Sequence, residues 1–213
     1  DARMVCIEEI EQDEYNLNIP RYVDSEEAED IQDIEAHLLG GIPNTDINEL
    51  SNFWEVYPTL KKALFGESIS YEIPSSKFNK IGEVTGQLVG GNLSLLQNMT
   101  GTNSSINTND KIIFIEEIGE YLYHIDRMLW GLKRNGYFNN CKGIIIGGMS
   151  KIKVNTTPFG KTVEEVVLEL TKEFNIPIMF DFPAGHDDLN VAMYMGRTIK
   201  MVVGAKKSKL IFK

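Results

Sequence analysis

Short apolar runs alternate with segments of helical spacing in the second part of the chain. The runs are rich in Ile, Val and Phe, which is typical of strands buried in a sheet. They occupy residues 112–115, 143–148, 177–180, 198–203 and 210–212. Their alternation with helical segments predicts an α/β fold, in which a small unit of sheet and helices buries most of its sheet.

Two helices are predicted between these strands. The first follows Glu120 and ends before Gly136, because a basic pair and a glycine are typical of a helix C-terminus. Its apolar face consists of Leu122, Ile125, Leu129 and Leu132. The second begins with a capping box formed by Thr162 and Glu165, and its apolar spacing continues as far as Phe174.

The first 70 residues show weak periodicity and a different charge. They hold 17 acidic and 4 basic residues, whereas residues 71–213 hold 14 and 17. An acidic helix is expected to end near Gly40-Gly41, and shorter helices are expected over 47–54 and around 60–65. With a linker at 66–70, the sequence predicts a mostly helical acidic segment over 1–67 and a sheet-and-helix domain over 71–213. We expect few contacts between these two units.

Composition argues against several classes of partner. No apolar run approaches the roughly 18 residues of a membrane helix, and the acidic first part is unsuited to gripping phosphates. Neither a membrane nor direct nucleic-acid binding is therefore expected. Cys6 and Cys141 provide no disulfide framework, although a single bridge between them stays open. This cysteine usage favours a reducing compartment, and we interpret the protein as cytoplasmic.

Two ionisable residues directly follow buried strands. Glu116 comes after 112–115, and His186 follows 177–180 through a short loop. A carboxylate that faces an imidazole fixes its tautomer and stabilises the imidazolium that forms when the ring takes a proton from a nucleophile. From the residues alone, the alternative stays open that Glu116 is a solvated charge and His186 a loop histidine bonded to backbone.

The remaining polar motifs favour structural roles. Glu120 and His124 are spaced to share a metal ion on one helix face, but no further Cys or His completes a ligand set, so an ordinary side-chain pair is expected. His37 is interpreted as a surface residue. The sequence Gly90-Gly91-Asn92 lacks the remaining residues of a phosphate-binding motif, so we expect a tight turn with close backbone approach. Neither a metal nor another cofactor is predicted.

A series of short motifs follows the order found in the C-terminal half of the muropeptide LD-carboxypeptidases. They are Gly86–Ser94, Thr100–Thr102, Phe114–Glu117 with Glu120 and Tyr123, Ile125–Leu129, Ile145–Gly148 and Ala184–His186. Over residues 71–213 the chain therefore resembles this family of serine peptidases, whose relatives include microcin-immunity peptidases.

The resemblance implies an activity and a catalytic triad. The activity is hydrolysis of the bond between a diamino acid and the terminal D-alanine of a murein tetrapeptide, without metal or cofactor. The family's triad is Ser-Glu-His, and the matching positions are Glu116 and His186. The family's serine and oxyanion hole lie in a preceding Rossmann-like domain. No early serine of this chain has that setting and Ser94 is expected to start a helix, so we expect little activity from this chain alone.

The first part of the chain resembles an unrelated family. The motifs are Glu8–Ile10, Tyr15–Asp24, Gly40–Pro43 and Trp54–Phe65. Over residues 1–67 they look like the tail of the methylation subunit of type I restriction-modification enzymes, which implies docking to such a subunit and no chemistry. Two functions therefore stay open. One is an LD-carboxypeptidase domain that acts on a murein peptide but lacks its nucleophile domain. The other is a non-catalytic interaction module, and a homodimer stays open as well.

Overall fold

A seven-stranded sheet organises the part of the chain that the computed structural model describes, residues 58–153 and 157–212. In chain order the elements are α4 (Pro58–Leu64), β1 (Ser70–Pro74), β2 (Gly82–Asn92), α5 (Leu93–Asn98), β3 (Lys111–Ile118), α6 (Leu122–Arg134), β4 (Gly143–Ser150), α7 (Val163–Leu170), β5 (Ile178–Met179), β6 (Thr198–Val203) and β7 (Lys207–Phe212). The helices predicted before residue 58, together with His37 and Cys6, lie outside the described residues.

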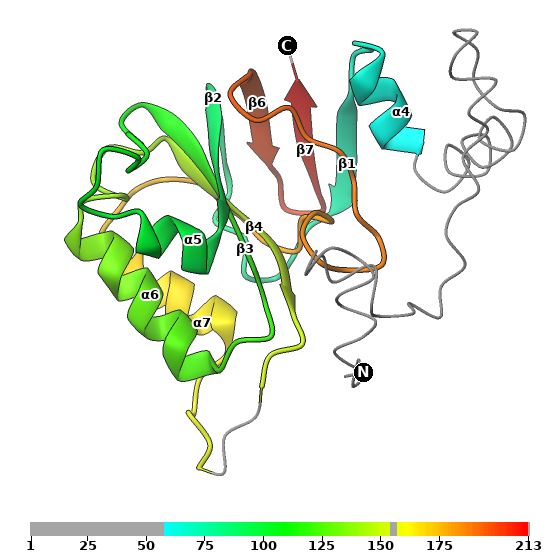
Figure 1. The fold of residues 1–213 in the computed structure, drawn as a ribbon. Helices are drawn as coiled ribbons and strands as arrows, with labels where there is room; N and C mark the ends of the chain where they lie inside the picture. Colours follow the sequence, from blue (N-terminus) through cyan, green and yellow to red (C-terminus); the bar gives the residue numbers. More distant parts are fainter. Residues whose placement is uncertain (1–57, 154–156, 213) are drawn as a thin grey trace, which may run out of the picture. The chain divides into compact units, whose positions relative to one another are not determined.

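The order of strands across the sheet is β1-β7-β6-β2-β3-β4-β5. Neighbouring strands from β2 to β5 are parallel, whereas β6 pairs antiparallel with β2 and β7, and β7 with β1. The helices α5, α6 and α7 connect the parallel strands and lie together on one face of the sheet (Figure 1). Crossovers that progress in one direction place their helices on one face. The predicted α/β fold is confirmed.

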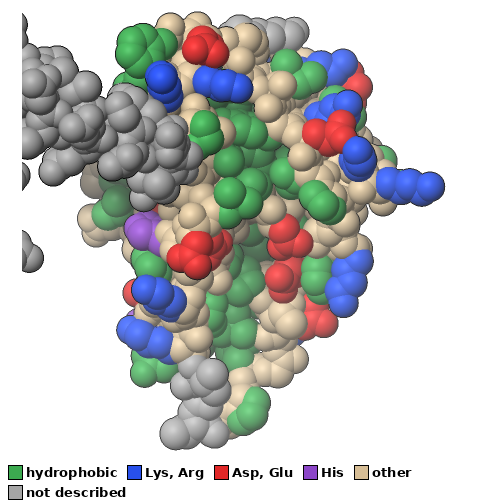
Figure 2. Space-filling model, turned by 90° about the vertical axis from the view of Figure 1, so that its right-hand side faces the viewer, with side chains coloured by type: hydrophobic (Ala, Val, Ile, Leu, Met, Phe, Trp, Pro, Cys, Tyr) green, Lys and Arg blue, Asp and Glu red, His purple; other side chains and the backbone are tan. Residues whose placement is uncertain are grey.

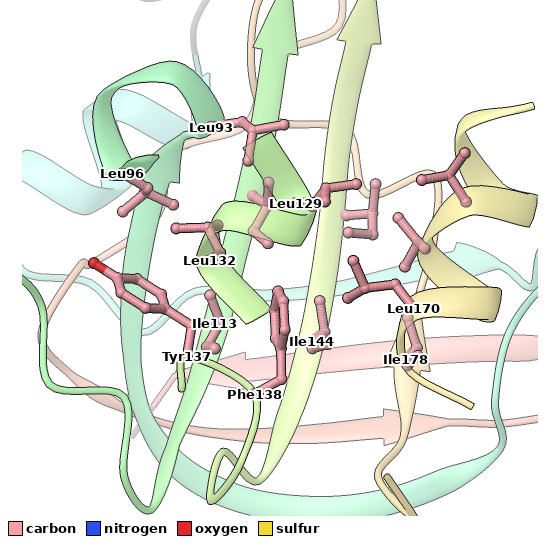
Figure 3. Close-up of a cluster of buried hydrophobic side chains, with 14 of the residues drawn as sticks. Leu93, Leu96, Ile113, Leu129, Leu132, Tyr137, Phe138, Ile144, Leu170 and Ile178 are labelled. Atoms are coloured by element: carbon pink, nitrogen blue, oxygen red, sulfur yellow. The ribbon is translucent and has the colours of Figure 1, made fainter. Parts of the chain in front are cut away.

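The main core lies between this helical layer and the sheet. Figure 3 shows Leu93 and Leu96, at the start of α5, together with Leu129 and Leu132 of α6, against the strands. The strand side chains are those of alternate residues, such as Ile113 of β3, because successive side chains of a strand point to opposite faces. Three residues of the predicted apolar face of α6, Ile125, Leu129 and Leu132, build this core, whereas the fourth, Leu122, is half-buried and lies outside it.

A second core covers the opposite face of the sheet. It contains the other set of alternating residues, including Ile112 and Phe114 of β3, and it packs against the loop that leads to β6. Helix α4 adds Ala63 to this core. Figure 2 shows one side of the molecule, where a strip of apolar side chains runs between acidic ones.

Helix α4 is held by hydrogen bonds to that loop. Thr59 Oγ1 accepts from the Ala192 amide at 3.1 Å, and the Tyr194 hydroxyl donates to the Ala63 carbonyl at 2.7 Å. The sequence predicts few contacts here, and for residues 58–67 the structure differs, since α4 belongs to the same compact unit as the sheet. The rest of the acidic segment over 1–57 lies outside the described residues, so the boundary between the two proposed families stays a prediction.

Several local predictions are confirmed and others need correction. The capping box of Thr162 and Glu165 is present at the start of α7, but this helix ends at Leu170, before Phe174. The strand predicted at 177–180 is shortened to the two residues of β5. The Gly90–Asn92 segment is the end of β2 and no tight turn. The expected close approach of two backbones is present, because a Cβ on Gly90 would lie 2.0 Å from the Phe114 carbonyl oxygen.

Candidate active site

The side chains of Glu116 and His186 meet at the end of β3. Nδ1 of His186 lies 2.8 Å from Oε2 of Glu116, although the residues are 70 positions apart. The glutamate side chain is only 8% exposed, whereas the histidine side chain is 49% exposed. The two candidate residues are therefore in contact, with the carboxylate shielded from water and the imidazole at the surface.

Glu116 owes its position to the parallel strands on both sides of β3. It is the last residue of β3 that pairs with β2, where its register partner is Asn92. Parallel strands direct their carboxyl ends to one edge of the sheet, where side chains from several strands converge. The alternation along β3 places Glu116 on the same face as Phe114 and away from the helical layer.

Two glycines of β4 make room for the histidine loop. The β3–β4 register advances from Ile115–Ile146 to Glu117–Met149, so Gly147 and Gly148 together lie opposite the single residue Glu116. Such a bulge bends a strand and redirects neighbouring side chains. The Gly148 amide donates to the Ala184 carbonyl at 2.8 Å, and a Cβ on Gly147 would lie 2.4 Å from that carbonyl oxygen. The loop therefore approaches the sheet because these positions lack side chains.

Gly185 and Asn190 fix the loop around His186. Gly185 has φ +138°, and a Cβ there would lie 3.2 Å from Oε2 of Glu116. The Asn190 side chain hydrogen-bonds both backbone polar groups of Gly185. It donates to the carbonyl at 2.8 Å and accepts from the amide at 3.2 Å. A larger residue at 185 would be strained in this backbone conformation and would crowd the carboxylate.

The next residue, Glu117, points to the helical face of the sheet and is 3% exposed. Its carboxylate accepts hydrogen bonds from the side chains of Asn92 and Ser94 and from the amides of Ser94 and Ile118. Burial acts to raise the pKa of Glu117, but these hydrogen bonds outweigh it and hold the pKa below its usual value. Glu117 therefore joins the start of α5 to the end of β3.

Serine hydroxyls near this edge of the sheet are already engaged. Ser94 Oγ donates to Oε2 of Glu117 at 2.5 Å, and Ser150 Oγ donates to Oδ1 of Asp187. Ser94 stands in the first turn of α5, as predicted. Among the described residues, no serine hydroxyl hydrogen-bonds the His186 ring. A pocket of about 310 Å³ lies beside the loop, lined by Gly147, Gly148 and Asp187 among others.

Glu120 and His124 form the expected ordinary pair, with Nδ1 of His124 2.8 Å from Oε2 of Glu120. In the residues that the structure describes, no group of three or more Cys, His, Asp or Glu side chains is arranged to hold a metal ion.

Cys141 is a free thiol, and burial raises its pKa to about 11. Within the same residues, no helix has the length and apolar character to cross a bilayer.

Comparison with known proteins shows which family the chain belongs to. The family model of the LD-carboxypeptidase C-terminal domain matches residues 85–201, more than half of the chain. The chain belongs to the LD-carboxypeptidase family. Both Glu116 and His186 fall within the matched residues, and the match ends before β7.

Curated members of the LD-carboxypeptidase family are similar over the same part of the chain. A probable murein peptide carboxypeptidase of Bacillus subtilis is 32% identical over 158 residues, covering 71% of this chain and 50% of that protein. The murein tetrapeptide carboxypeptidase of Pseudomonas aeruginosa is 28% identical over 116 residues, covering 54% of this chain and 37% of that protein. The chain thus spans about half the length, or less, of these relatives.

Solved structures agree on the fold. The muramoyltetrapeptide carboxypeptidase of Oxalobacter formigenes superposes with a TM-score of 0.67 at 26% identity, covering 73% of this chain and 53% of that one. The microcin C7 self-immunity protein MccF gives a TM-score of 0.57 at 24% identity, covering 63% of this chain and 40% of that one. At that identity the second likeness concerns the fold alone.

Sequence reasoning missed the residues that support the Glu116–His186 pair. Glu117 is the second acid at the end of an apolar strand, a signal that was available in the pattern. Asn190 offered no signal, because an asparagine four residues after a histidine is ordinary in a loop. The glycine pair at 147–148 marked a strand end in the sequence, but its bulge depends on the β3–β4 register, which only the folded sheet defines.

Proposed function

We propose that Glu116 and His186 are the carboxylate and the general base of a serine-type LD-carboxypeptidase site that releases terminal D-alanine from murein tetrapeptides. The observation that carries the proposal is the 2.8 Å contact between a buried carboxylate and a half-exposed imidazole. Murein peptides are supported as the substrate class by the names of the relatives, which describe carboxypeptidases of murein peptides.

The geometry suits the imidazole for proton transfer. An ionised carboxylate only accepts hydrogen bonds, so Glu116 favours the tautomer of His186 with the proton on Nδ1. Nε2 then carries the free lone pair, and it makes no hydrogen bond to any residue that the structure describes. This nitrogen is suited to take the proton of an attacking serine hydroxyl and to return it to the leaving amine of D-alanine. Glu116 stabilises the imidazolium that exists between these steps.

The attacking hydroxyl would come from outside the described residues. Ser94 and Ser150 are both bonded to carboxylates, which leaves them poorly placed to meet Nε2. The serine would attack the carbonyl of the diamino acid, the C–N bond to D-alanine would break, and water would hydrolyse the resulting acyl ester. His186 would serve as base and then as acid in both halves of this cycle.

A cytoplasmic location is part of the proposal. Cys141 is free and buried, which fits a reducing compartment. A homodimer stays a prediction, and so does a docking role of residues 1–67 toward a restriction-modification subunit.

The proposed function is tested by supplying the 213-residue chain's His186 with a nucleophile. A chimera would join residues 58–213, which include α4 and the whole of β1, to the part of the Bacillus subtilis relative that lies outside the match. We expect it to release D-alanine from the tetrapeptide and to leave a tetrapeptide ending in L-alanine intact. The 213-residue chain alone, under the same conditions, is expected to be slower by several orders of magnitude. A folded chimera without D-alanine release would contradict the proposal.

A further inference from the structure

The proposed catalytic carboxylate stands on the last residue of a hydrogen-bonded ladder. The β2–β3 pairing ends at Asn92 and Glu116, because β2 gives way to α5 at Leu93. Strand ends open more readily than strand centres when nothing replaces the missing main-chain bonds. A glutamate in this position needs another constraint to keep its orientation toward His186.

The side chain of Glu117 supplies bonds where the ladder stops. Oε1 accepts from Asn92 Nδ2 at 2.9 Å and from the Ile118 amide at 2.9 Å. Oε2 accepts from the Ser94 amide at 2.8 Å and from the Ser94 hydroxyl at 2.5 Å. Two of the donor residues belong to the end of β2 and the start of α5, so the carboxylate ties both of them to β3.

Glu116 and Glu117 share one rigid peptide unit. Their side chains lie on opposite faces of the sheet, one toward His186 and one toward α5. The hydrogen bonds that the Glu117 carboxylate accepts therefore restrict rotation of the backbone that orients the Glu116 side chain. On the other side of β3, the Gly148 amide donates a hydrogen bond to the Ala184 carbonyl, which holds the histidine loop against β4.

We propose that Glu117 is a positioning residue, which holds Glu116 in hydrogen-bonding orientation toward His186 through its bonds to Asn92 and Ser94. The inference rests on the proposed function of the Glu116–His186 pair, but its evidence is independent of any activity. A purely structural role would stabilise α5 without affecting the histidine. The two roles predict different behaviour of the His186 ring proton.

The test uses the 213-residue chain and the imidazole N–H signals in its NMR spectrum. The Nδ1 proton of His186, assigned by its loss in His186→Ala, is expected at low field and in slow exchange with water because Glu116 accepts it. In Glu117→Gln the side-chain amide cannot accept from all four donors. We expect the His186 proton to exchange about tenfold faster, equivalent to a loss of about 1.4 kcal/mol of protection.

The matched control is Glu120→Gln, which replaces the carboxylate beside His124 by a neutral amide and leaves Glu117 untouched. It is expected to change the His124 signal and to leave that of His186 as in the parent chain. Ser94→Ala is a milder variant, because it deletes one of the four donors and keeps the Ser94 amide. We expect it to accelerate exchange at His186 by a smaller factor.

Methyl chemical shifts of the core would show whether each variant is folded. A folded Glu117→Gln chain with an unchanged His186 proton would overturn the proposal. If Glu117→Gln does not fold, Ser94→Ala decides, and an unchanged His186 signal there would overturn it equally. Altered exchange at His186 together with an inactive chimera would leave the positioning role standing and would reject the peptidase proposal.

Discussion

His186 and His124 each place Nδ1 2.8 Å from Oε2 of a glutamate, yet the two pairs differ in their surroundings. Glu120 and His124 are one helical turn apart, and their side chains are 30% and 37% exposed. Glu116 is 8% exposed, and its partner comes from a loop 70 residues away. The same contact distance thus arises from helix periodicity in one case and from the assembly of three strands and a loop in the other.

The difference shows what to examine beyond distance when a Glu–His pair is interpreted. The pair on α6 needs no special support, because residues four apart on a helix are neighbours. The pair at the sheet edge depends on Gly147, Gly148 and Gly185, each of which would meet another group with an added Cβ. A site that requires such support is a stronger functional candidate than a surface pair with the same Nδ1–Oε2 distance.

The largest expected difference in stability concerns glycines near the two pairs. In Gly147→Ala the new Cβ would lie 2.4 Å from the Ala184 carbonyl oxygen, so we expect a loss of about 2–3 kcal/mol in the free energy of unfolding. In Gly131→Ala, on α6, the Cβ would make an ordinary 3.5 Å contact with Gln97, and a gain of up to about 1 kcal/mol is expected. Urea unfolding of both variants would check this, and equal stabilities would contradict the account of the bulge.

A smaller effect is expected from pH, and it separates Glu117 from its neighbours. Its pKa is lower in the folded chain than the ordinary value of about 4.3, so the stability it contributes is present at neutral pH and is lost as pH falls through the folded-state pKa. Glu117→Gln should therefore be less stable than the parent chain at pH 7, by about 1–3 kcal/mol. This difference should narrow below pH 4. A difference that stays constant between pH 7 and pH 3 would show that the carboxylate charge is unimportant.

Hydrophobic pattern was sufficient to predict most of the described fold. The α6 face, the capping box at Thr162 and the apolar runs of β3, β4 and β6 were predicted, because burial imposes a period that survives in a single sequence. The long parallel strand β2 was not among the predicted runs. The β1 strand was missed, since its alternation of half-buried and exposed residues is weak and its pairing partner β7 lies at the other end of the chain. The sequence predicts a turn at the end of β2 because glycines are common in turns, whereas here Gly90 admits the Phe114 backbone.

The site was predicted only in part for a related reason. Glu116 and His186 were identified by their places after buried strands, and the resemblance to a family added their roles. The contacts that hold these two residues in place depend on the tertiary register. They are the hydrogen bonds between Asn190 and Gly185, the bulge in β4 and the hydrogen bonds of Glu117. None of these contacts leaves a local pattern in the sequence.

The most direct measurement of the central claim is the rate of D-alanine release by the chimera with each pair altered in turn. His186→Ala and Glu116→Gln are expected to lower the rate by about a thousandfold or more, because both belong to the proposed triad. His124→Ala and Glu120→Gln, which alter a pair of the same length, are expected to change it by no more than about twofold. Comparable losses from both pairs, or full activity of folded His186→Ala, would contradict the account.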